Sequence, residues 1–556
     1  MSKKTVGQLL KDYGYVTEEQ IQVALEVKKI RDKLLGEILI ELSFVSPREI
    51  ALVVAKQSGK AYIDLNEHPP SLDALKLFDR SIAKQLEIIP LENRPDKLIV
   101  AVADPFNINT LDILKRKAGK EVEIFVADKE TIFKNIEINY FLLEKPIDEE
   151  IAKIVSKAVR TGNQTEIPYL LELIINSAII SRATDIHVSP EDIGTHVFYR
   201  VDGILRHFYV FPKEMHSVIT SRVKIMSGMD IAEQRLPQDG SMTHTFFDEF
   251  FDIRVSTIPT VYGEGMVMRV LSKNVSLFNM DGLGFEKPTQ HRLEKQLSRP
   301  HGILLVTGPT GSGKTTTLYA SLRKINSLQR KVLTAEDPIE YKFPFIKQTQ
   351  VNEKAGYTFA RAMRAFLRQD PDVILLGEMR DEETSEMAMR AAITGHLVLS
   401  TLHTNDAVTA IPRLLEMNIK DYMIASGVGG ILAQRLVRKV CIFCRKEETI
   451  TGAKLLGMGI PEDMMARNGI SFDSEVKYMR GHGCEMCKNT GYSGRGVISE
   501  FLEIDDVIGD LIVNGASPLK IFTTAVERGM IPILESGLIK MMNGVTTPEE
   551  ILRVAL

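Results

Sequence analysis

The sequence predicts a multidomain α/β protein organised around a P-loop nucleotide-binding domain. Its 556 residues exceed the size of one ordinary domain and suggest roughly three or four. An apolar run at residues 303–306 leads directly into G-P-T-G-S-G-K-T at residues 308–315, and a helix-forming segment follows. Strand, glycine-rich loop and helix thus occur in the order that a P-loop requires. Two C-x-x-C pairs in the C-terminal part of the chain add a predicted metal site.

The composition is that of an ordinary globular protein, with 44% hydrophobic and 26% charged residues. The net charge of −4 argues against a nucleic-acid-binding surface over the whole protein, because such a surface concentrates basic residues. No apolar run is long enough to cross a bilayer, and the start of the chain lacks the apolar core of a signal peptide. We therefore expect a cytoplasmic protein that meets a membrane only through its partners, with no nucleic acid among them.

Residues 1–62 contain a degenerate repeat, in which residues 6–21 resemble residues 35–50. Each copy predicts a helix, a short turn and a second helix, with Thr17 or Ser46 as the N-cap of the second. Two copies are too few for a solenoid, so we interpret this segment as a small helical docking module.

Two segments separate the repeat from a larger domain. Residues 63–145 alternate short strand-like runs with helical ones and predict a small α/β domain, in which the sequence shows no catalytic cluster. Residues 146–167 are polar and charged, and they predict a linker that carries one helix.

Residues 168–275 predict an α+β domain, in which one helix precedes several strands. The Asp202-Gly203 pair between two apolar runs indicates a tight hairpin turn. Arg254 and Arg269 lie in two later strands beside apolar neighbours. These two arginines are either ordinary exposed strand residues or contacts for a phosphate, including one bound across a subunit boundary.

Residues 276–556 are predicted to form the nucleotide-binding domain. Backbone amides of the glycine-rich loop and the N-terminus of the helix that follows it bind phosphate oxygens in proteins of this kind. Lys314 is expected to reach the β- and γ-phosphates of ATP, and the Thr315 hydroxyl to bind Mg²⁺. The residues predicted to contact the nucleotide are Gly308, Pro309, Thr310, Gly311, Ser312, Gly313, Lys314, Thr315 and Thr316.

Acidic residues follow two of the later predicted strands, at the carboxyl edge where open α/β sheets bind ligands. Glu378 follows an apolar run and is expected to help hold Mg²⁺, although Gly377 stands where the commonest P-loop pattern has an aspartate. A second carboxylate must orient or deprotonate the attacking water. Glu336 and Glu340 both follow the strand that begins at Val332, and their positions leave both open for this role.

Histidines and arginines supply further candidates. His396 and His403 bracket a predicted strand, and we interpret them together as sensors of the γ-phosphate, since ATP hydrolysis depends mostly on positioning and charge stabilisation. Three arginines lie at i, i+3 and i+7, on one face of a predicted helix. That face is either a solvated basic stripe or one that meets a phosphate or another subunit. These arginines are Arg361, Arg364 and Arg368.

The four cysteines form the pairs Cys441/Cys444 and Cys484/Cys487. Four thiolates suit a tetrahedral Zn²⁺ that has no open position, so the predicted site is structural. In a reducing compartment such pairs favour a metal over a disulfide, and the alternatives are a redox function or plain buried thiols. The pairs lie further apart than in a usual zinc ribbon, so a long segment between them is expected to loop out.

Taken together, these motifs resemble those of the type II secretion and type IV pilus assembly ATPases, from about residue 60 to the end of the chain. The resemblance rests on the P-loop, the acidic segment 336–340, the Gly377-Glu378 pair, the two histidines and the four cysteines. It implies a PAS-like fold for residues 168–275 and a RecA-like fold for residues 276–556, with a zinc-binding insertion at 437–500.

The same resemblance implies a mechanism and partners. It implies a homohexameric motor that hydrolyses ATP with Mg²⁺, in which Arg254 and Arg269 reach the nucleotide and Glu340 is the favoured water-activating residue. Hydrolysis would move a hinge around residues 272–285. The implied partners are an inner-membrane platform protein and a docking protein at the cytoplasmic face of that membrane, where the motor would be peripheral.

The N-terminal repeat resembles a module that binds cyclic di-GMP in some members of this family. Thr5 and Leu34 stand where the arginines of that module belong, and neither can stack on guanine or pair with phosphate as arginine does. Protein docking is therefore the preferred interpretation, with cyclic di-GMP as the alternative.

Three other functions share part of this pattern. A pilus retraction ATPase would have the same core, but the cysteine pairs and residues 1–145 argue against it. A P-loop nucleic-acid translocase would require a basic channel. A nucleotide-gated scaffold would bind ATP without turnover. The sequence does not separate pilus extension from type II secretion.

Overall fold

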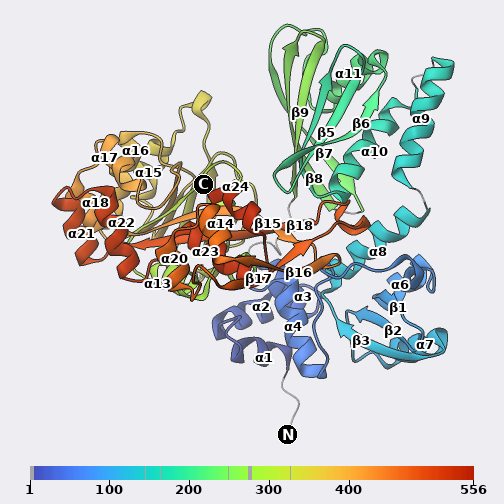
Figure 1. Cartoon of the computed structure of the whole chain (residues 1–556), viewed down its shortest axis with the longest axis horizontal. Coiled ribbons are helices and arrows are strands. Elements are labelled where there is room, and N and C mark those ends of the chain that lie inside the picture. The colour runs from blue at the N-terminus through green and yellow to red at the C-terminus, as the bar shows by residue number, and fades with distance from the viewer. Residues whose placement is uncertain are drawn as a thin grey trace. The chain divides into compact units, whose positions relative to one another are not determined.

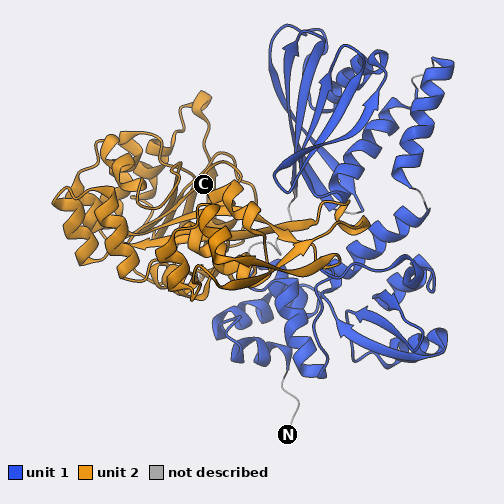
Figure 2. Cartoon of the chain, viewed as in Figure 1, with its two compact units in different colours: residues 1–276 blue, residues 277–556 orange. Residues whose placement is uncertain are grey.

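The computed structural model describes residues 5–144, 146–162, 165–247, 249–272, 279–325 and 327–555. The chain forms two compact units, residues 1–276 and residues 277–556 (Figure 2). Residues 273–278 of the hinge predicted around residues 272–285 lie outside the described residues.

The first unit begins with four helices that correspond to the two copies of the repeat (Figure 1). Thr17 and Ser46 cap the second helix of each copy, as predicted, and each side chain accepts a hydrogen bond from the backbone N–H three residues later. Thr5 caps the first helix in the same way. The helices are α1 (Val6–Asp12), α2 (Glu18–Ile30), α3 (Leu35–Glu41) and α4 (Pro47–Ser58).

A three-stranded sheet in the order β1-β2-β3 follows, packed with four helices around its own apolar core. Its strands are β1 (Ile88–Asn93), β2 (Lys97–Val102) and β3 (Glu121–Val126). Its helices are α5 (Leu72–Leu75), α6 (Arg80–Leu86), α7 (Ile108–Ala118) and α8 (Lys129–Glu144).

The segment predicted as a linker forms one helix, α9 (Ile147–Thr161), which is amphipathic. Its buried residues Ile147, Ile151 and Ile154 belong to the same apolar core as α10 (Ile167–Ile180). The polar residues that suggested a linker therefore form the outer face of a packed helix.

The larger sheet of the first unit has six strands in the order β6-β5-β4-β9-β8-β7, and all its neighbours are antiparallel. Helices α10 and α11 (His216–Met226) pack on one face (Figure 1). Asp202 and Gly203, with φ values of 50° and 83°, form the predicted turn between β5 and β6. The strands are β4 (Ala183–Pro190), β5 (Thr195–Val201), β6 (Ile204–Phe211), β7 (Gln238–Phe246), β8 (Glu249–Thr260) and β9 (Gly263–Ser272).

The second unit is built on a seven-stranded sheet in the order β12-β11-β13-β14-β10-β15-β18. Every neighbouring pair is parallel except β15 with β18. The predicted α/β architecture is thus confirmed, and the continuous apolar strands are explained by burial of both faces. The strands are β10 (Gly302–Thr307), β11 (Val332–Glu336), β12 (Lys347–Gln350), β13 (Val373–Leu376), β14 (Leu397–Leu402), β15 (Val428–Val440) and β18 (Tyr492–Glu503).

Helices cover both faces of this sheet. One face carries α13 (Lys287–Leu297) and α14 (Lys314–Lys324). The other packs against a second set of helices through a larger apolar cluster. This set consists of α15 (Phe359–Phe366), α16 (Glu382–Ile393), α17 (Ala410–Glu416), α18 (Asp421–Gly427), α21 (Asp506–Val513) and α22 (Pro518–Glu527).

A small insertion lies between β15 and β18. Its two-stranded sheet pairs β16 (Arg445–Thr451) with β17 (Glu475–Gly481), and helices α19 (Gly452–Gly457) and α20 (Glu462–Arg467) connect them. The insertion shares an apolar cluster with α23 (Ile533–Met542) and α24 (Pro548–Ala555).

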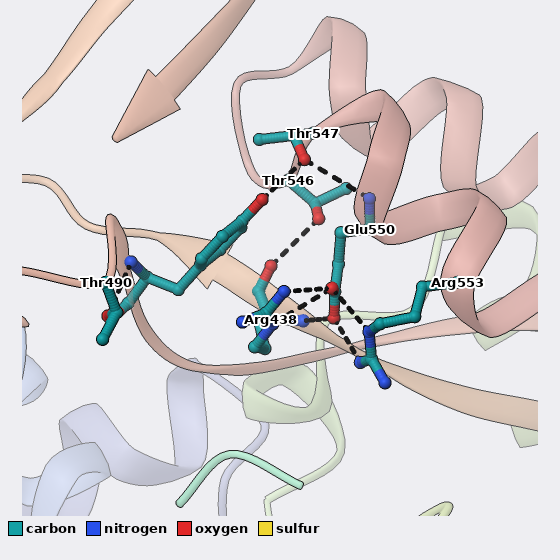
Figure 3. A network of polar contacts seen from close by, with 7 residues as sticks. Arg438, Thr490, Thr546, Thr547, Glu550 and Arg553 are labelled. Carbon is teal, nitrogen blue, oxygen red and sulfur yellow. Dashed lines mark hydrogen bonds and ion pairs between the residues drawn. The ribbon is translucent and has the colours of Figure 1, made fainter. Parts of the chain in front are cut away.

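A buried ion pair fixes α24 to β15 (Figure 3). The Glu550 carboxylate is fully buried and accepts hydrogen bonds from the backbone and guanidinium of Arg438 and from Arg553. Burial alone would raise the pKa of Glu550, but the hydrogen bonds from both arginines hold it below its ordinary value. The Arg438 guanidinium also lies 4.0 Å from the ring centre of Tyr492, whose hydroxyl is 2.7 Å from that of Thr547. The C-terminal helix is therefore anchored to a strand of the main sheet.

Candidate nucleotide and zinc sites

The glycine-rich loop connects β10, which is buried throughout, to the first turn of α14. Gly308, Gly311 and Gly313 have φ values of 144°, 80° and 90°, a region that side chains disfavour. A Cβ atom on Gly308 would lie 2.5 Å from the carbonyl oxygen of Gln434, so this position has no room for a side chain. Backbone conformation and close packing together require the glycine pattern.

Lys314 is the first residue of α14, and its ammonium group lies over the loop. Its Nζ donates to the carbonyl oxygens of Gly308 (2.8 Å) and Pro309 (3.2 Å). Burial lowers the pKa of Lys314, and the nearby Glu378 carboxylate opposes that shift. Thr315 is exposed beside it, in the first turn of the helix. Phosphate oxygens bound at this helix terminus would accept the same hydrogen bonds from Lys314.

Gln434, on β15, holds the loop in place, and motif reasoning missed it. Its buried side-chain amide donates to the carbonyl of Ser312 (2.7 Å) and accepts from the hydroxyl of Thr317 on α14 (2.8 Å). One side chain thus joins the loop, the helix and a neighbouring strand. The only signal in the sequence is a polar residue at the end of the buried run 428–433.

Glu336 and Glu340, which the sequence left as alternatives for the water-activating acid, have different environments in the structure. Glu336 is buried at the end of β11, where its carboxylate accepts from Thr334 Oγ1 (2.5 Å), Gln348 Nε2 (3.0 Å) and the Tyr319 hydroxyl. The Tyr319 hydroxyl in turn accepts from the backbone N–H of Glu340 (3.0 Å). Glu336 therefore positions the backbone of Glu340, whose own side chain is half-buried beyond the Asp337–Pro338 bond.

Glu378 and His403 meet at the carboxyl ends of neighbouring strands β13 and β14. Their Oε2 and Nε2 atoms lie 3.7 Å apart, and Arg380 also pairs with Glu378. Burial lowers the pKa of His403, Lys314 and Arg380 lower it further, and Glu378 opposes them. The net effect favours the neutral form of the His403 imidazole. The predicted residues Lys314, Glu378 and His403 form one cluster, to which the structure adds Arg380.

The prediction that His396 acts together with His403 is wrong. His396 precedes β14 and His403 follows it, so the length of the strand, roughly 20 Å, separates them. The His396 ring contacts the carbonyl of Ala391 at 2.9 Å. It lies at the amino-terminal ends of the parallel strands, whereas the P-loop lies at their carboxyl ends. The strand was identified from its apolar residues, but its direction places only one of its flanking histidines at the site.

The three arginines expected on one helical face are divided by the end of α15 at Phe366. Arg361 and Arg364 are exposed on the helix, where Arg364 pairs with Glu383. Arg368 follows the helix in a turn. The three arginines therefore do not share one helical face.

Arg254 and Arg269 lie side by side in the first unit, because they are register partners on β8 and β9. The same row continues through Asp185 on β4 to Arg200 on β5. Asp185 is buried, and its carboxylate oxygens lie 3.0 Å from Arg269 Nε and 3.7 Å from Arg200 Nε. Arg269 and Arg200 thus share one acid, and Arg254 lies beside Arg269 in the same positively charged row. Motif reasoning missed Asp185 and Arg200, since only the register of the sheet brings them together.

The four cysteine sulfurs cluster at the base of the insertion. All four lie within 4.8 Å of one another, with separations of 3.8 Å for Cys441–Cys484 and Cys444–Cys487 and 3.7 Å for Cys484–Cys487. Four Zn–S bonds of about 2.3 Å in a tetrahedron require a sulfur spacing of roughly 3.8 Å. The donor set therefore fits Zn²⁺, with four thiolates as its ligands.

Backbone amides donate hydrogen bonds to two of these sulfurs, those of Cys444 and Cys487. Gly483 N–H donates to the Cys444 sulfur, and those of Cys484 and Gly491 donate to the Cys487 sulfur, each over 3.2 Å. Burial alone would raise the pKa of Cys487, but the amides of Cys484 and Gly491 and the side chains of Cys484 and Cys444 outweigh burial and lower it to about 6. Burial raises the pKa values of Cys441 and Cys444, so Cys487 is the sulfur that most favours the thiolate without a metal. Thiolate is the form that binds metal.

Comparison with known proteins decides the family. The family model described as "Type II/IV secretion system protein" matches residues 159–553. The chain belongs to this family. A second model, the MshEN domain, matches residues 58–140. The resemblance inferred from the motifs is thus confirmed.

Individual relatives cover most of the chain. The type IV pilus assembly ATPase PilB of Myxococcus xanthus is 38% identical over 562 residues, covering 98% of both chains. Type II secretion system protein E of Dickeya dadantii is 44% identical over 385 residues, covering 69% of this chain and 75% of the relative. The solved structure of the ATPase DotB of Yersinia pseudotuberculosis has a TM-score of 0.51 at 20% identity, covering 69% of this chain and 93% of DotB, and so shares its fold.

Among the residues that the structure describes, no helix is both long and apolar enough to cross a bilayer.

We predict that the purified protein holds about one zinc per chain, and that Cys484→Ser removes it. Losing one thiolate opens the site, and structural zinc contributes on the order of 10 kcal/mol to folding of such modules. Metal analysis and thermal unfolding measure both effects. Met486→Ser changes an exposed residue between two cysteines and should retain zinc. A Cys484→Ser protein with a full complement of zinc would contradict the assignment.

Proposed function

We propose that this protein is an ATPase that drives assembly of a type IV pilus or of the pseudopilus of a type II secretion system. The observation that carries the proposal is the cluster of Lys314, Glu378 and His403 around a P-loop, in a chain of the type II/IV secretion family. Relatives named for pilus assembly and for type II secretion match at 38% and 44% identity, which supports both processes alike.

Assembly is favoured over the two other motor functions. The M. xanthus assembly ATPase matches along 98% of both chains, so the N-terminal segments and the cysteine insertion fall within the match. A retraction ATPase would share only the core. The net charge of −4 gives a nucleic-acid translocase no support.

The proposed partners follow from the same family. We propose a homohexamer at the cytoplasmic face of the inner membrane, which acts on a platform protein and is held there by a docking protein. The N-terminal repeat is the proposed docking module. Cyclic di-GMP is left out of this proposal, because Thr5 and Leu34 occupy the helix N-cap positions where arginines would be required.

Catalysis is proposed to proceed by positioning and charge stabilisation. The loop amides and Lys314 bind the phosphates of ATP, and Thr315 and Glu378 would hold Mg²⁺, which would supply positive charge to the phosphates. Glu340 orients the attacking water and accepts its proton. Neutral His403 donates a hydrogen bond to the γ-phosphate as negative charge develops there. Glu336 acts through Tyr319 and keeps the backbone of Glu340 in place.

The ATPase proposal is tested with Lys314→Ala. Removing the ammonium group should lower ATP turnover by about 10²-fold or more, because the negative charge on the phosphates in the transition state is no longer stabilised by a fixed positive charge. Phosphate release by the purified protein is the measurement. Lys342→Ala, at an exposed position, is the control and should leave turnover unchanged. Equal rates for wild type and Lys314→Ala would leave a nucleotide-gated scaffold as the better account.

Glu340→Gln should lower kcat by about 10²–10⁴-fold while ATP binding is retained, because it removes a general base. Glu336→Gln should chiefly lower the melting temperature, since an amide cannot accept all three hydrogen bonds of the buried carboxylate. Kinetics, binding of a non-hydrolysable ATP analogue and thermal unfolding separate the two effects. An inactive Glu336→Gln protein of normal stability, beside an active Glu340→Gln protein, would reverse the assignment.

We extend the proposal to Arg254 and Arg269 as contacts for the phosphates of ATP. Alanine at either position should lower kcat by about tenfold or more, because arginines supplied to a phosphoryl transition state contribute at least that much. Arg160→Ala removes an exposed arginine on α9 and serves as the control. Turnover and thermal unfolding are measured together. Turnover at the wild-type level in both alanine variants would contradict the proposal and would indicate that Arg254 and Arg269 serve only the structure of the sheet.

A further inference from the structure

Glu500 is a buried carboxylate in the second unit that the proposed catalytic steps do not use. It lies on β18 and is only 3% exposed. Register across the sheet aligns it with Ala433 on β15, which is aligned with Thr307 at the end of β10. The small side chain of Ala433 stands between Glu500 and the strand that carries the P-loop.

Each oxygen of Glu500 accepts a hydrogen bond from a different backbone segment. Oε1 accepts from the N–H of Ala407 at 2.7 Å, and Oε2 accepts from the N–H of Ile533 at 3.0 Å. Ala407 belongs to the loop at residues 403–409, called here the His403 loop. Ile533 is the first residue of α23, where the positive end of the helix dipole stabilises a carboxylate.

The His403 loop is tied to the P-loop on its other side. Thr307, the residue before Gly308, donates through its hydroxyl to the carbonyl of Thr404 over 2.9 Å. Arg435 on β15 donates to the carbonyl of Asn405 over 2.9 Å. The loop that carries His403 is therefore held by β10, β15 and β18 together.

Helix α23 connects Glu500 to the insertion. Ser536 on α23 accepts from the backbone N–H of Ser499, next to Glu500 on β18 (3.1 Å). Glu535 accepts hydrogen bonds from Arg467 Nε and Nη2 (3.1 and 2.7 Å) and from Asn468 Nδ2 (3.0 Å), and both residues lie in the insertion. Leu538 and Met541 of α23 complete the apolar core of the insertion. A continuous set of contacts thus leads from His403 through Glu500 to the cysteine-bearing insertion.

We propose that Glu500 is a positioning residue for ATP turnover, which fixes the His403 loop to α23 and so couples the nucleotide site to the insertion. This inference rests on the proposed ATPase function. A carboxylate is required because two N–H donors converge on it from opposite sides. A glutamine turns its NH2 group toward one of them, and an apolar residue leaves both without an acceptor. Burial raises the pKa of Glu500 to about 7, a penalty that these two hydrogen bonds offset in part.

Glu500→Gln is the test. It should lower kcat by about tenfold or more and change KM by less than about threefold, because the loss falls on the transition state rather than on ATP binding. Amide hydrogen exchange should accelerate in residues 403–409 and at the start of α23, which a local defect elsewhere would not produce. Glu503→Gln, on the same strand and paired with Lys295 at 3.0 Å, is the matched control and should leave all three readouts unchanged.

If Glu500→Gln does not fold, Glu500→Asp replaces it. The aspartate keeps the charge but is too short for both donors, so it should give a smaller loss of kcat and faster exchange in one of the two segments. Normal kcat in a folded Glu500 variant, or normal exchange in both segments, would overturn the inference. A wild-type protein without ATP turnover would instead overturn the proposed function, and exchange would still report whether Glu500 holds the two segments.

Discussion

The hydrogen bonds of Gln434 are the interaction on which the nucleotide site depends. The glycines of the loop have no side chains with which to fix its shape, so contacts from neighbouring elements help to hold its conformation. Gln434 does this from β15, through Ser312 and Thr317. Further along the same strand, Arg438 anchors α24, and Cys441 follows directly after the strand ends. One strand therefore sets the positions of the P-loop, the C-terminal helix and the cysteine cluster.

Burial explains why two acids so close in sequence have different roles. An ionised carboxylate inside a protein is tolerated only when hydrogen bonds replace its lost water. The Glu336 carboxylate accepts hydrogen bonds from Tyr319, Thr334 and Gln348, which leaves it little capacity to bind a further water molecule. Glu340, four residues further along the chain, is half-buried, and its backbone N–H donates a hydrogen bond to the Tyr319 hydroxyl. The different roles proposed for the two glutamates follow from these environments, since the residue type is the same.

Sequence motifs predicted the structural features that depend on residues close together in the sequence or at a fixed spacing. The glycine-rich loop, the helix caps at Thr17 and Ser46 and the cysteine pairs each depend on residues that are near in sequence or on a specific spacing, and the structure shows all three. Gln434 and Glu500 escaped prediction because their partners come from strands and loops far along the chain. The error at His396 arose similarly, since an apolar run predicts a strand without indicating which end reaches the site.

The insertion illustrates why a small module needs a metal or a neighbour. A two-stranded sheet is marginally stable by itself, and β16 with β17 has only two short helices of its own. Packing against α23 and α24 supplies part of the missing core. The cysteine cluster supplies the rest, because Cys441 follows the end of β15 and Cys487 precedes the start of β18. Zinc at this point would fasten together the ends of two antiparallel strands, one of which carries Gln434 and the other Glu500. A metal site remote from the P-loop would thereby stiffen both strands that hold the nucleotide site in shape.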